Sequence, residues 1–291
     1  MVICFSVLHY QNDSDTIKCV DSILKLPQYG HDVYVVIVDN ASTNNSYAHL
    51  VNKYSNEKSI FILQNNINEG FAKGNNIGYR YSRNILAAEI IVVLNNDVII
   101  EQNDFIEVLL QINAQKNADI IGPKIINTNN YNQNPLRMYR FSTARIIKDL
   151  LFNFLMGYIV YQIPVINQKI AIILEKRRAN KQRINEADSK NDSELKDVVL
   201  HGAAICYCNN YIQNENQAFL EETFLFGEED ILFDYAKKKH YVSLYSPKIR
   251  VKHNEDSSIK LITKSELNKR KFMSKNKVYS LFILIRLRVT K

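Results

Sequence analysis

Short apolar runs alternate with amphipathic segments through the first 126 residues of the chain. The run at 90–94 is unbroken and rich in β-branched residues, which predicts a strand buried on both faces. Strands are predicted at 2–8, 33–38, 59–63, 90–94 and 119–126; helices at 15–25, 42–54 and around 104–115; and a loop rich in glycine and asparagine leads into a helix at 68–83. This alternation predicts an α/β fold with a mostly parallel central sheet flanked by helices.

The pattern changes between about 127 and 197, which we interpret as an insertion carrying one or two helices. Residues 150–163 are strongly apolar and aromatic, but the segment is shorter than the roughly 20 residues that a membrane span needs. Two interpretations stay open for this segment. It packs on the core or on a partner subunit, as in a homodimer, or it makes an interfacial contact with lipid.

Sheet character resumes at 198–208 and again at 241–251, where Pro247 interrupts the run. A helix is predicted at 227–239, and a basic helix at 265–287. We therefore divide the chain into a main domain at 1–255, with the insertion at about 127–197, and a basic helical tail at 256–291. The tail either packs on the main domain or docks on lipid.

The net charge of +7 over 291 residues is unevenly distributed. From Lys260 to Lys291 there are ten Lys or Arg residues and one acid, a balance of +9, so the other residues sum to −2. A basic tail favours nucleic acid or anionic lipid as a partner. No recognised nucleic-acid motif accompanies it, so we expect no nucleic acid and favour peripheral membrane contact through 150–163 and 265–288.

The expected compartment is the cytoplasm. Only four cysteines occur, and the spacing of Cys206 and Cys208 suits neither a disulfide nor a metal knuckle. The first residues lack the basic leader of a signal peptide.

Polar residues follow two of the predicted strands at the end where open α/β sheets bind their ligands. Asp39 and Asn40 follow the strand at 33–38, and Asn95-Asn96-Asp97 follows the strand at 90–94. Taken alone, Asn95-Asn96-Asp97 is explained equally well as a turn. The Asp39 group could also be the N-cap of the helix that follows, with Ser42 or Thr43 as the capping residue.

Three further groups carry chemistry. Residues 68–78 combine asparagines with small residues that let a backbone approach a ligand closely. Glu228, Glu229 and Asp230 begin a predicted helix, where the helix dipole alone favours acids. Apolar neighbours would also raise the pKa of one carboxyl group, which suits a general base. His253 ends a strand; a lone histidine is usually structural, but beside Asp97 it would be a ligand for a divalent metal.

Taken in order, these groups resemble glycosyltransferase family 2, the inverting enzymes with the GT-A fold, and most closely its rhamnosyltransferase-like branch. The resemblance covers about 1–126 and 198–285. It is carried by Val7-Leu8-His9-Tyr10, Val38-Asp39-Asn40-Ala41-Ser42, the Asn68–Gly78 signature, Leu94-Asn95-Asn96-Asp97, His201-Gly202-Ala203-Ala204, Glu229-Asp230, His253 and Lys275-Asn276-Lys277.

The resemblance implies a role for each of these positions. Asp39 would recognise the base of a nucleoside diphosphate sugar, and the side chains near the donor would be Asn40, Asn75, Asn95 and Asn96. Asp97 would hold Mn²⁺ or Mg²⁺ on the diphosphate, with His253 completing the metal site. Asp230 would deprotonate the acceptor hydroxyl, with Glu229 beside it. Asn95 departs from the family pattern, which can have Asp at that position.

The implied activity is transfer of a sugar, with inversion, from a UDP- or dTDP-sugar to a hydroxyl of a lipid-linked bacterial surface polysaccharide. The setting would be the inner face of the plasma membrane. A second hypothesis is a non-catalytic nucleotide-sugar-binding or scaffold subunit. A sugar-nucleotide pyrophosphorylase is disfavoured, because residues 9–15 lack the Gly-rich basic loop which those enzymes carry after their first strand.

Overall fold

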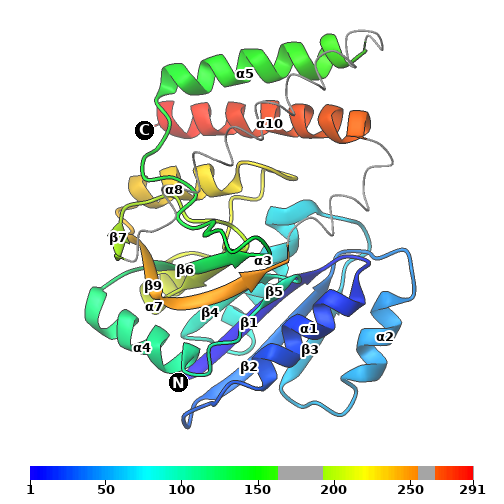
Figure 1. Cartoon of the computed structure of the whole chain (residues 1–291), viewed down its shortest axis with the longest axis vertical. Coiled ribbons are helices and arrows are strands. Elements are labelled where there is room, and N and C mark those ends of the chain that lie inside the picture. The colour runs from blue at the N-terminus through cyan, green and yellow to red at the C-terminus, as the bar shows by residue number, and fades with distance from the viewer. Residues whose placement is uncertain (163–192, 255–265, 291) are drawn as a thin grey trace.

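The computed structural model describes residues 1–162, 193–254 and 266–290. One sheet in the order β3-β2-β1-β4-β8-β6-β9-β5 forms its centre, and β7 pairs with β9 (Figure 1). The strands are β1 Val2–His9, β2 Asp32–Asp39, β3 Ile60–Gln64, β4 Ile90–Asn95, β5 Val98–Ile99, β6 Ile120–Asn127, β7 Leu195–Lys196, β8 Ala204–Tyr207 and β9 Ser243–His253. The helices are α1 Asp13–Leu24, α2 Ser46–Lys53, α3 Gly70–Asn84, α4 Phe105–Lys116, α5 Thr143–Tyr158, the 3₁₀ turn η1 Val160–Gln162, α7 Asn209–Asn214, α8 Glu228–Lys238 and α10 Glu266–Val289.

The predicted parallel sheet is confirmed for β3, β2, β1 and β4, which all run in one direction. Successive residues of β4 alternate between two apolar clusters: Ile90 and Val92 join the cluster under α1 and α4, whereas Ile91 and Val93 join the cluster under α3 and α8. Alternation of this kind explains why the strand is apolar from Ile90 to Leu94, since helices cover both faces of the sheet.

Strand register brings the predicted polar ends together. His9 pairs with Asp39 and Leu8 with Asn95, so the carboxyl ends of β1, β2 and β4 form one edge of the sheet. The later strands are mixed in direction, because β8 runs antiparallel to both β4 and β6, while β9 runs parallel to β6 and antiparallel to β5.

Three local predictions were wrong in detail. Helix α2 begins at Ser46 after Asn45, because the backbone N–H of Ser42 instead donates to the Asp39 carboxylate. The helix expected to follow a loop within 68–83 is present, but it begins already at Gly70, so most of the glycine- and asparagine-rich stretch is helical. Within 198–208, only Ala204–Tyr207 is a strand of the sheet, since residues 202 and 203 form a turn.

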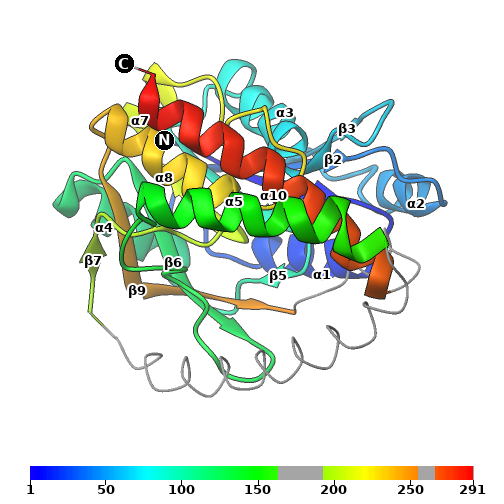
Figure 2. The same cartoon turned by 90° about the horizontal axis from the view of Figure 1, so that it is seen from above.

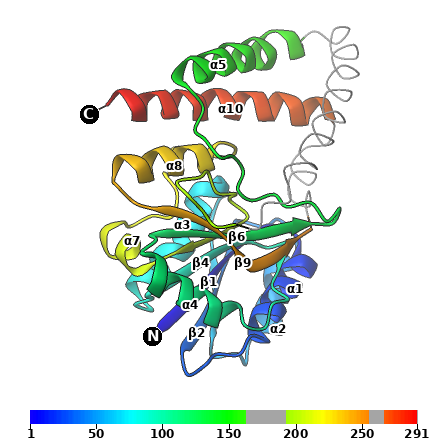
Figure 3. The same cartoon turned by 60° about the vertical axis from the view of Figure 1, so that its left-hand side comes forward.

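A third layer lies above α8. The helices α5 and α10 lie side by side there, and α5 is the outermost element on that side (Figures 1 and 3). Ile146 of α5, Ile231 of α8, and Ile283 and Leu284 of α10 form a separate apolar cluster that holds the three helices together.

The basic helix expected in the tail is confirmed as α10. An ion pair from Arg288 to Asp234 fastens its end to α8. Residues 150–158 of the apolar run belong to a helix that begins earlier, at Thr143, where the Ser142 hydroxyl caps it. Residues 160–162 form the turn η1, and residue 163 lies outside the described residues. Most of the rest of the region that we interpreted as an insertion, residues 163–192, also lies outside the described residues. Among those described, no helix is both long and apolar enough to cross a bilayer.

Candidate active site

A pocket of about 880 Å³ opens at the carboxyl edge of the sheet, below the α5–α10 pair. Two acids that are far apart in the chain, Asp97 and Asp230, both line it. The other predicted site residues that line it are Asn40, Asn95, Asn96, Glu229 and His253. Asp39 and Asn75 are buried and do not line the pocket. The structure therefore brings seven of the nine predicted residues to one cavity.

Asp97 and His253 face each other across a short strand pair. Val98 of β5 pairs with His253 at the end of β9, and the backbone N–H of Asn254 donates to the Asp97 carbonyl at 3.0 Å. The His253 Nε2 atom lies 3.2 Å from Asp97 Oδ1, and both side chains are more than nine-tenths buried. Two strands thus fix the spacing between an imidazole and a carboxylate that are 156 residues apart in the sequence.

The hydrogen bonding of His253 fits a metal ligand. Its Nδ1 lies 2.8 Å from Oε1 of Gln133, which only accepts, so Nδ1 is the donor. In the tautomer that carries its proton on Nδ1, Nε2 offers a lone pair toward Asp97 Oδ1, a buried atom without a hydrogen-bond partner. Two facing acceptors are stabilised by a cation between them, and a second-shell acceptor on the other ring nitrogen is typical of metal-bound histidine.

The protein itself supplies only part of a coordination shell. Among the described residues, no group of three or more His, Cys, Asp or Glu side chains is arranged to hold a metal ion. Asp97 and His253 fit Mn²⁺ or Mg²⁺ only if other oxygen ligands complete the shell. Water and substrate phosphates do so in many magnesium sites.

The asparagines near this edge mostly tie loops together. Asn40 donates to Asn68 Oδ1 and to the Gly70 carbonyl, and its own Oδ1 accepts from Asn65 and from the Glu69 N–H, all at 3.0–3.1 Å. Its side chain therefore shapes the pocket wall beneath the start of α3.

Asn96 and Asn75 also bond within the protein. Asn96 donates to the Asn12 carbonyl and to Thr16 Oγ1, which links the end of β4 to the start of α1. Asn75 donates to the Phe71 carbonyl, while its Oδ1 is buried without a hydrogen-bond partner.

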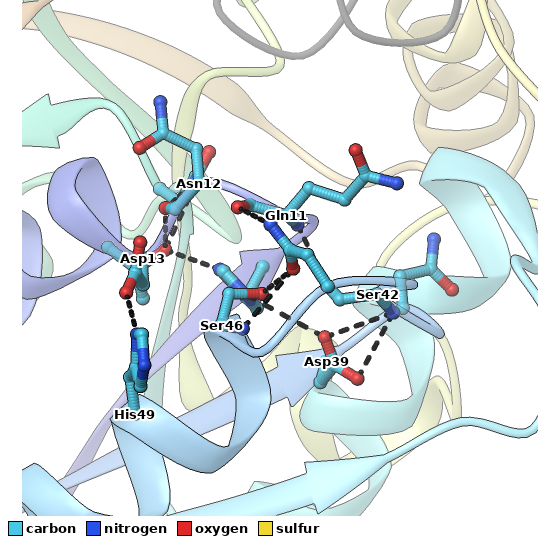
Figure 4. Close-up of polar contacts among 12 residues, drawn as sticks. Gln11, Asn12, Asp13, Asp39, Ser42, Ser46 and His49 are labelled. Atoms are coloured by element: carbon cyan, nitrogen blue, oxygen red, sulfur yellow. Dashed lines mark hydrogen bonds and ion pairs between the residues drawn. The ribbon is translucent and has the colours of Figure 1, made fainter.

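Asp39 belongs to a buried polar network between the loops that follow β1 and β2 (Figure 4). Both of its carboxylate oxygens lie 3.3 Å from the N–H of Ser42. His9 Nε2 lies 3.7 Å away, and this ring is held by Thr16 Oγ1 at 2.7 Å and Ser46 Oγ at 2.9 Å. Burial lowers the pKa of His9, so the ring is neutral at pH 7. The backbone of Gln11, with φ of 60°, closes over this network by donating to Ser42 Oγ.

The acids that begin α8 form another part of the pocket wall. Phe226 and Gly227 precede them with φ of 72° and 96°, and such left-handed conformations turn the chain sharply into the helix. Burial raises the pKa of Glu228 to about 8 and also raises the pKa of Glu229. A Cβ at Gly202 would lie 3.1 Å from Glu229 Oε1, so the turn after His201 leaves room for that carboxylate.

Asp230 has a cationic partner that the sequence did not reveal. The Arg137 guanidinium forms an ion pair with its Oδ1 and lies 4.0 Å from the centroid of the Phe141 ring. Burial raises the pKa of Asp230, and the charge and hydrogen bond of Arg137 oppose that rise. Phe226, which also lines the pocket, was not predicted either. Arg137 and Phe141 lie in the region that matched no motif, so only their position in space identifies them.

The fold is thus an α/β sheet with a pocket at its carboxyl edge, and Asp97 and Asp230 both line that pocket. A family model described as "Glycosyl transferase family 2" matches residues 7–186, more than half of the chain. The chain therefore belongs to glycosyltransferase family 2 and has the GT-A fold. The match runs through most of the region that we interpreted as an insertion.

Curated relatives agree with this assignment. The chain is 29% identical over 121 residues to the low-salt glycan biosynthesis hexosyltransferase Agl10 of Haloferax volcanii. The aligned stretch covers 42% of this chain and 36% of that relative. It is 26% identical over 136 residues to the glycosyltransferase GlyG of Streptococcus pneumoniae, and this alignment covers 47% of this chain and 42% of GlyG. The chain thus spans less than half of the length of these relatives.

Solved structures show the same fold. S. aureus TarS 1-349 in complex with UDP-GlcNAc superposes with a TM-score of 0.56 at 15% identity, over 89% of this chain and 60% of that chain. GalNAc-T7 with UDP, GalNAc and Mn²⁺ superposes with a TM-score of 0.58 at 11% identity, over 89% of this chain and 44% of that chain.

Proposed function

We propose that this chain transfers a sugar from a nucleoside diphosphate sugar to an acceptor hydroxyl, with inversion at the anomeric carbon. The observation that carries the proposal is that one pocket is lined both by Asp97 with His253, at the ends of β-strands, and by Asp230, in the first turn of α8. Direct displacement needs a cation beside the leaving diphosphate and a base on the other side of the reacting sugar.

The donor would lie along the carboxyl edge of the sheet. Asn40, Asn95 and Asn96 line the pocket and would lie beside the donor, and Asp97 and His253 would hold Mn²⁺ or Mg²⁺. The expected roles of Asp39 in recognising the base and of Asn75 near the donor would require these two buried side chains to become accessible when the donor binds. A bound cation would neutralise the charge that develops on the diphosphate. Solved structures of this fold hold UDP-GlcNAc or UDP with Mn²⁺, so UDP-sugars are the first donors to test. The dTDP-sugars, including the rhamnose donor suggested by the resemblance, come next.

The base would be Asp230, with Glu229 shaping the site beside it. In the displacement, Asp230 takes the proton of the acceptor hydroxyl, the hydroxyl oxygen bonds to the anomeric carbon, and the bond from that carbon to the diphosphate oxygen breaks. Arg137 favours the ionised form of Asp230, which the base must have before it accepts the proton.

The acceptor would be a lipid-linked saccharide of a bacterial surface polysaccharide, reached at the inner face of the plasma membrane. Apolar and aromatic side chains support an amphiphilic acceptor, because they line the end of the pocket beneath the helix pair: Phe141, Phe152, Phe226, Leu281 and Leu284.

The division of the chain into a main domain at 1–255 and a tail at 256–291 also stays a proposal. Helix α10 of the tail packs on α5 and α8 of the main domain and lines the same pocket.

Substitution of the base tests the proposal. We expect Asp230→Asn to lower transfer by about three orders of magnitude or more while UDP and Mn²⁺ bind with nearly unchanged affinity, measured by product formation and calorimetry. Asp104→Asn, in a residue before α4 and outside the pocket lining, is the matched control. A fully active Asp230→Asn variant would remove the base assignment. Binding of donors without turnover of any acceptor would favour the non-catalytic subunit.

A further inference from the structure

Helix α5 presents apolar side chains on its outer side. Ile147, Leu151, Phe154, Leu155 and Tyr158 are all exposed, and their spacing of four, seven, eight and eleven residues places them on one face of the helix. The opposite face supplies the buried residues of α5: Ile146, Met156 and Gly157. A surface helix usually directs polar residues outward, so this outward stripe is unusual.

The stripe is accessible within the described part of the chain. Figure 2 looks down on α5 and α10 lying side by side, and Figures 1 and 3 show α5 as the outermost element. The side chain of Leu151 is 64% exposed, and Phe154 stacks on Tyr158 at a centroid distance of 5.1 Å. Contiguous exposed apolar surface of this kind marks a docking site.

Basic residues border the stripe. Helix α10 carries seven Lys or Arg residues and one acid, Glu266. Its Lys275 places Nζ 5.3 Å from the ring centroid of Tyr158, so a cation adjoins one end of the stripe. On α5 itself, Lys148 is exposed next to Ile147. This arrangement is complementary to a surface that is apolar within and anionic at its boundary.

The stripe is also continuous with the pocket. Phe152 is half exposed on the side of α5, and it lines the pocket together with Asn153. On the facing helix, Lys277, Leu281 and Leu284 line the same cavity. The helix pair is therefore the roof of the pocket and the outermost surface of the molecule at once.

We propose that the outward stripe of α5, together with Lys148 and Lys275, docks on an anionic lipid surface with the helix lying in the headgroup layer. Basic residues flanking an exposed aromatic and aliphatic face are typical of helices that lie in the membrane interface. A second copy of this chain fits the stripe less well, because the same basic helices would then face each other.

Docking in this orientation has a consequence for the substrate, which rests on the proposed function. The roof of the pocket would lie at the lipid surface, so an acceptor attached to a lipid would reach Asp230 by passing beside Phe152. The protein would then not need to extract the whole lipid from the bilayer.

Vesicle co-sedimentation tests the docking surface. We expect the full chain to bind vesicles of phosphatidylcholine with phosphatidylglycerol, and to bind pure phosphatidylcholine more weakly. Leu151→Glu and Phe154→Glu should each lower binding at least about tenfold, and Lys275→Glu about fivefold. The controls are Ile85→Glu, at a site 66% exposed at the end of α3, and Lys25→Glu, at an exposed site at the end of α1. Both should bind as the unchanged chain does.

Several outcomes would overturn the proposal. Equal pelleting of Leu151→Glu and the unchanged chain would do so, as would equal binding to neutral and anionic vesicles. A chain that binds no vesicles but forms dimers which Leu151→Glu dissociates, measured by light scattering, would assign the stripe to a second copy. Asp230→Asn separates this proposal from the proposed function, since the variant should lose transfer and keep vesicle binding.

Discussion

Arg137 and Asp230 form an ion pair in the wall of the pocket, although 93 residues separate them in the chain. Arg137 is held on both sides: its backbone pairs with Val199, and its guanidinium lies over the Phe141 ring. The pair uses only Oδ1 of the carboxylate, and Oδ2 makes no hydrogen bond to any described residue. The arginine thus fixes the carboxylate while leaving one oxygen for an acceptor hydroxyl.

Removal of the Arg137 charge should shift the pH dependence of transfer. Asp230 acts as a base only when it is ionised, so activity falls as the pH drops through its pKa. Burial raises that pKa, and Arg137 opposes the rise. Arg137→Met should therefore move the acidic limb of kcat/KM upward by about one pH unit or more and lower the rate at pH 7 roughly tenfold. The measurement is a pH–rate profile.

Two further variants make this test specific. Arg137→Lys keeps the charge and should restore most of the profile. Arg140 is an exposed arginine three residues after Arg137 and lies near Asp234. Arg140→Met therefore removes a nearby positive charge that does not contact Asp230, and it should leave the profile unchanged. A profile that is the same for Arg137→Met and the unchanged chain would mean that the arginine has only a packing role.

Glu228 should make the protein less stable as the pH rises. Its folded-state pKa is raised from 4.5 to about 8, so the protonated carboxyl favours the folded state below about pH 4.5 and this contribution is lost as the pH rises through 8. Glu228→Gln should flatten the dependence and raise the free energy of unfolding at pH 8 by on the order of 3 kcal/mol. Urea unfolding at pH 5 and pH 8 measures it.

Glu57→Gln, in an exposed loop, is the matched control and should change the unfolding free energy equally at both pH values. If Glu228→Gln and the unchanged chain lose the same stability between pH 5 and pH 8, then Glu228 is not the group that titrates in this range.

Much of the fold was predictable because it depends on local patterns. Strand β4 is apolar from Ile90 to Leu94 because both faces of the sheet are covered, and polar residues, Asn95 to Asp97, follow at its carboxyl end. The convergence of Asp97 and His253 was predictable in outline. Their pairing depends on a two-residue strand, β5, that no periodicity signals.

The remainder of the site follows from packing that sequence patterns do not encode. Arg137 lies in a loop without periodicity, and its role arises only because its backbone pairs with Val199 and its side chain meets Asp230 of α8. Asn75 was predicted near the donor from its place in the Asn68–Gly78 signature. Since α3 begins at Gly70, Asn75 lies on the buried side of the helix. Gly78 serves that packing, because a Cβ there would lie 2.1 Å from Ser6 Oγ.

Metal affinity should depend on a residue that does not touch the metal. Gln133 accepts from His253 Nδ1 and so leaves Nε2 free to bind a cation beside Asp97. Gln133→Leu removes this acceptor, and we expect Mn²⁺ affinity in the presence of UDP to fall about 10- to 100-fold. Asp97→Ala should abolish metal-dependent UDP binding. Isothermal titration with Mn²⁺ measures both effects.

Gln102→Leu is the matched control for this experiment. Gln102 also bonds to β9, through the carbonyl of Lys248 and the N–H of Arg250, but it has no contact with the histidine ring. Its loss should leave Mn²⁺ affinity unchanged while removing a similar number of hydrogen bonds to the same strand. Equal affinities for Gln133→Leu and Gln102→Leu would show that the orientation of His253 does not depend on Gln133. The pairing of His253 with Asp97 would then need no supporting acceptor to hold a cation.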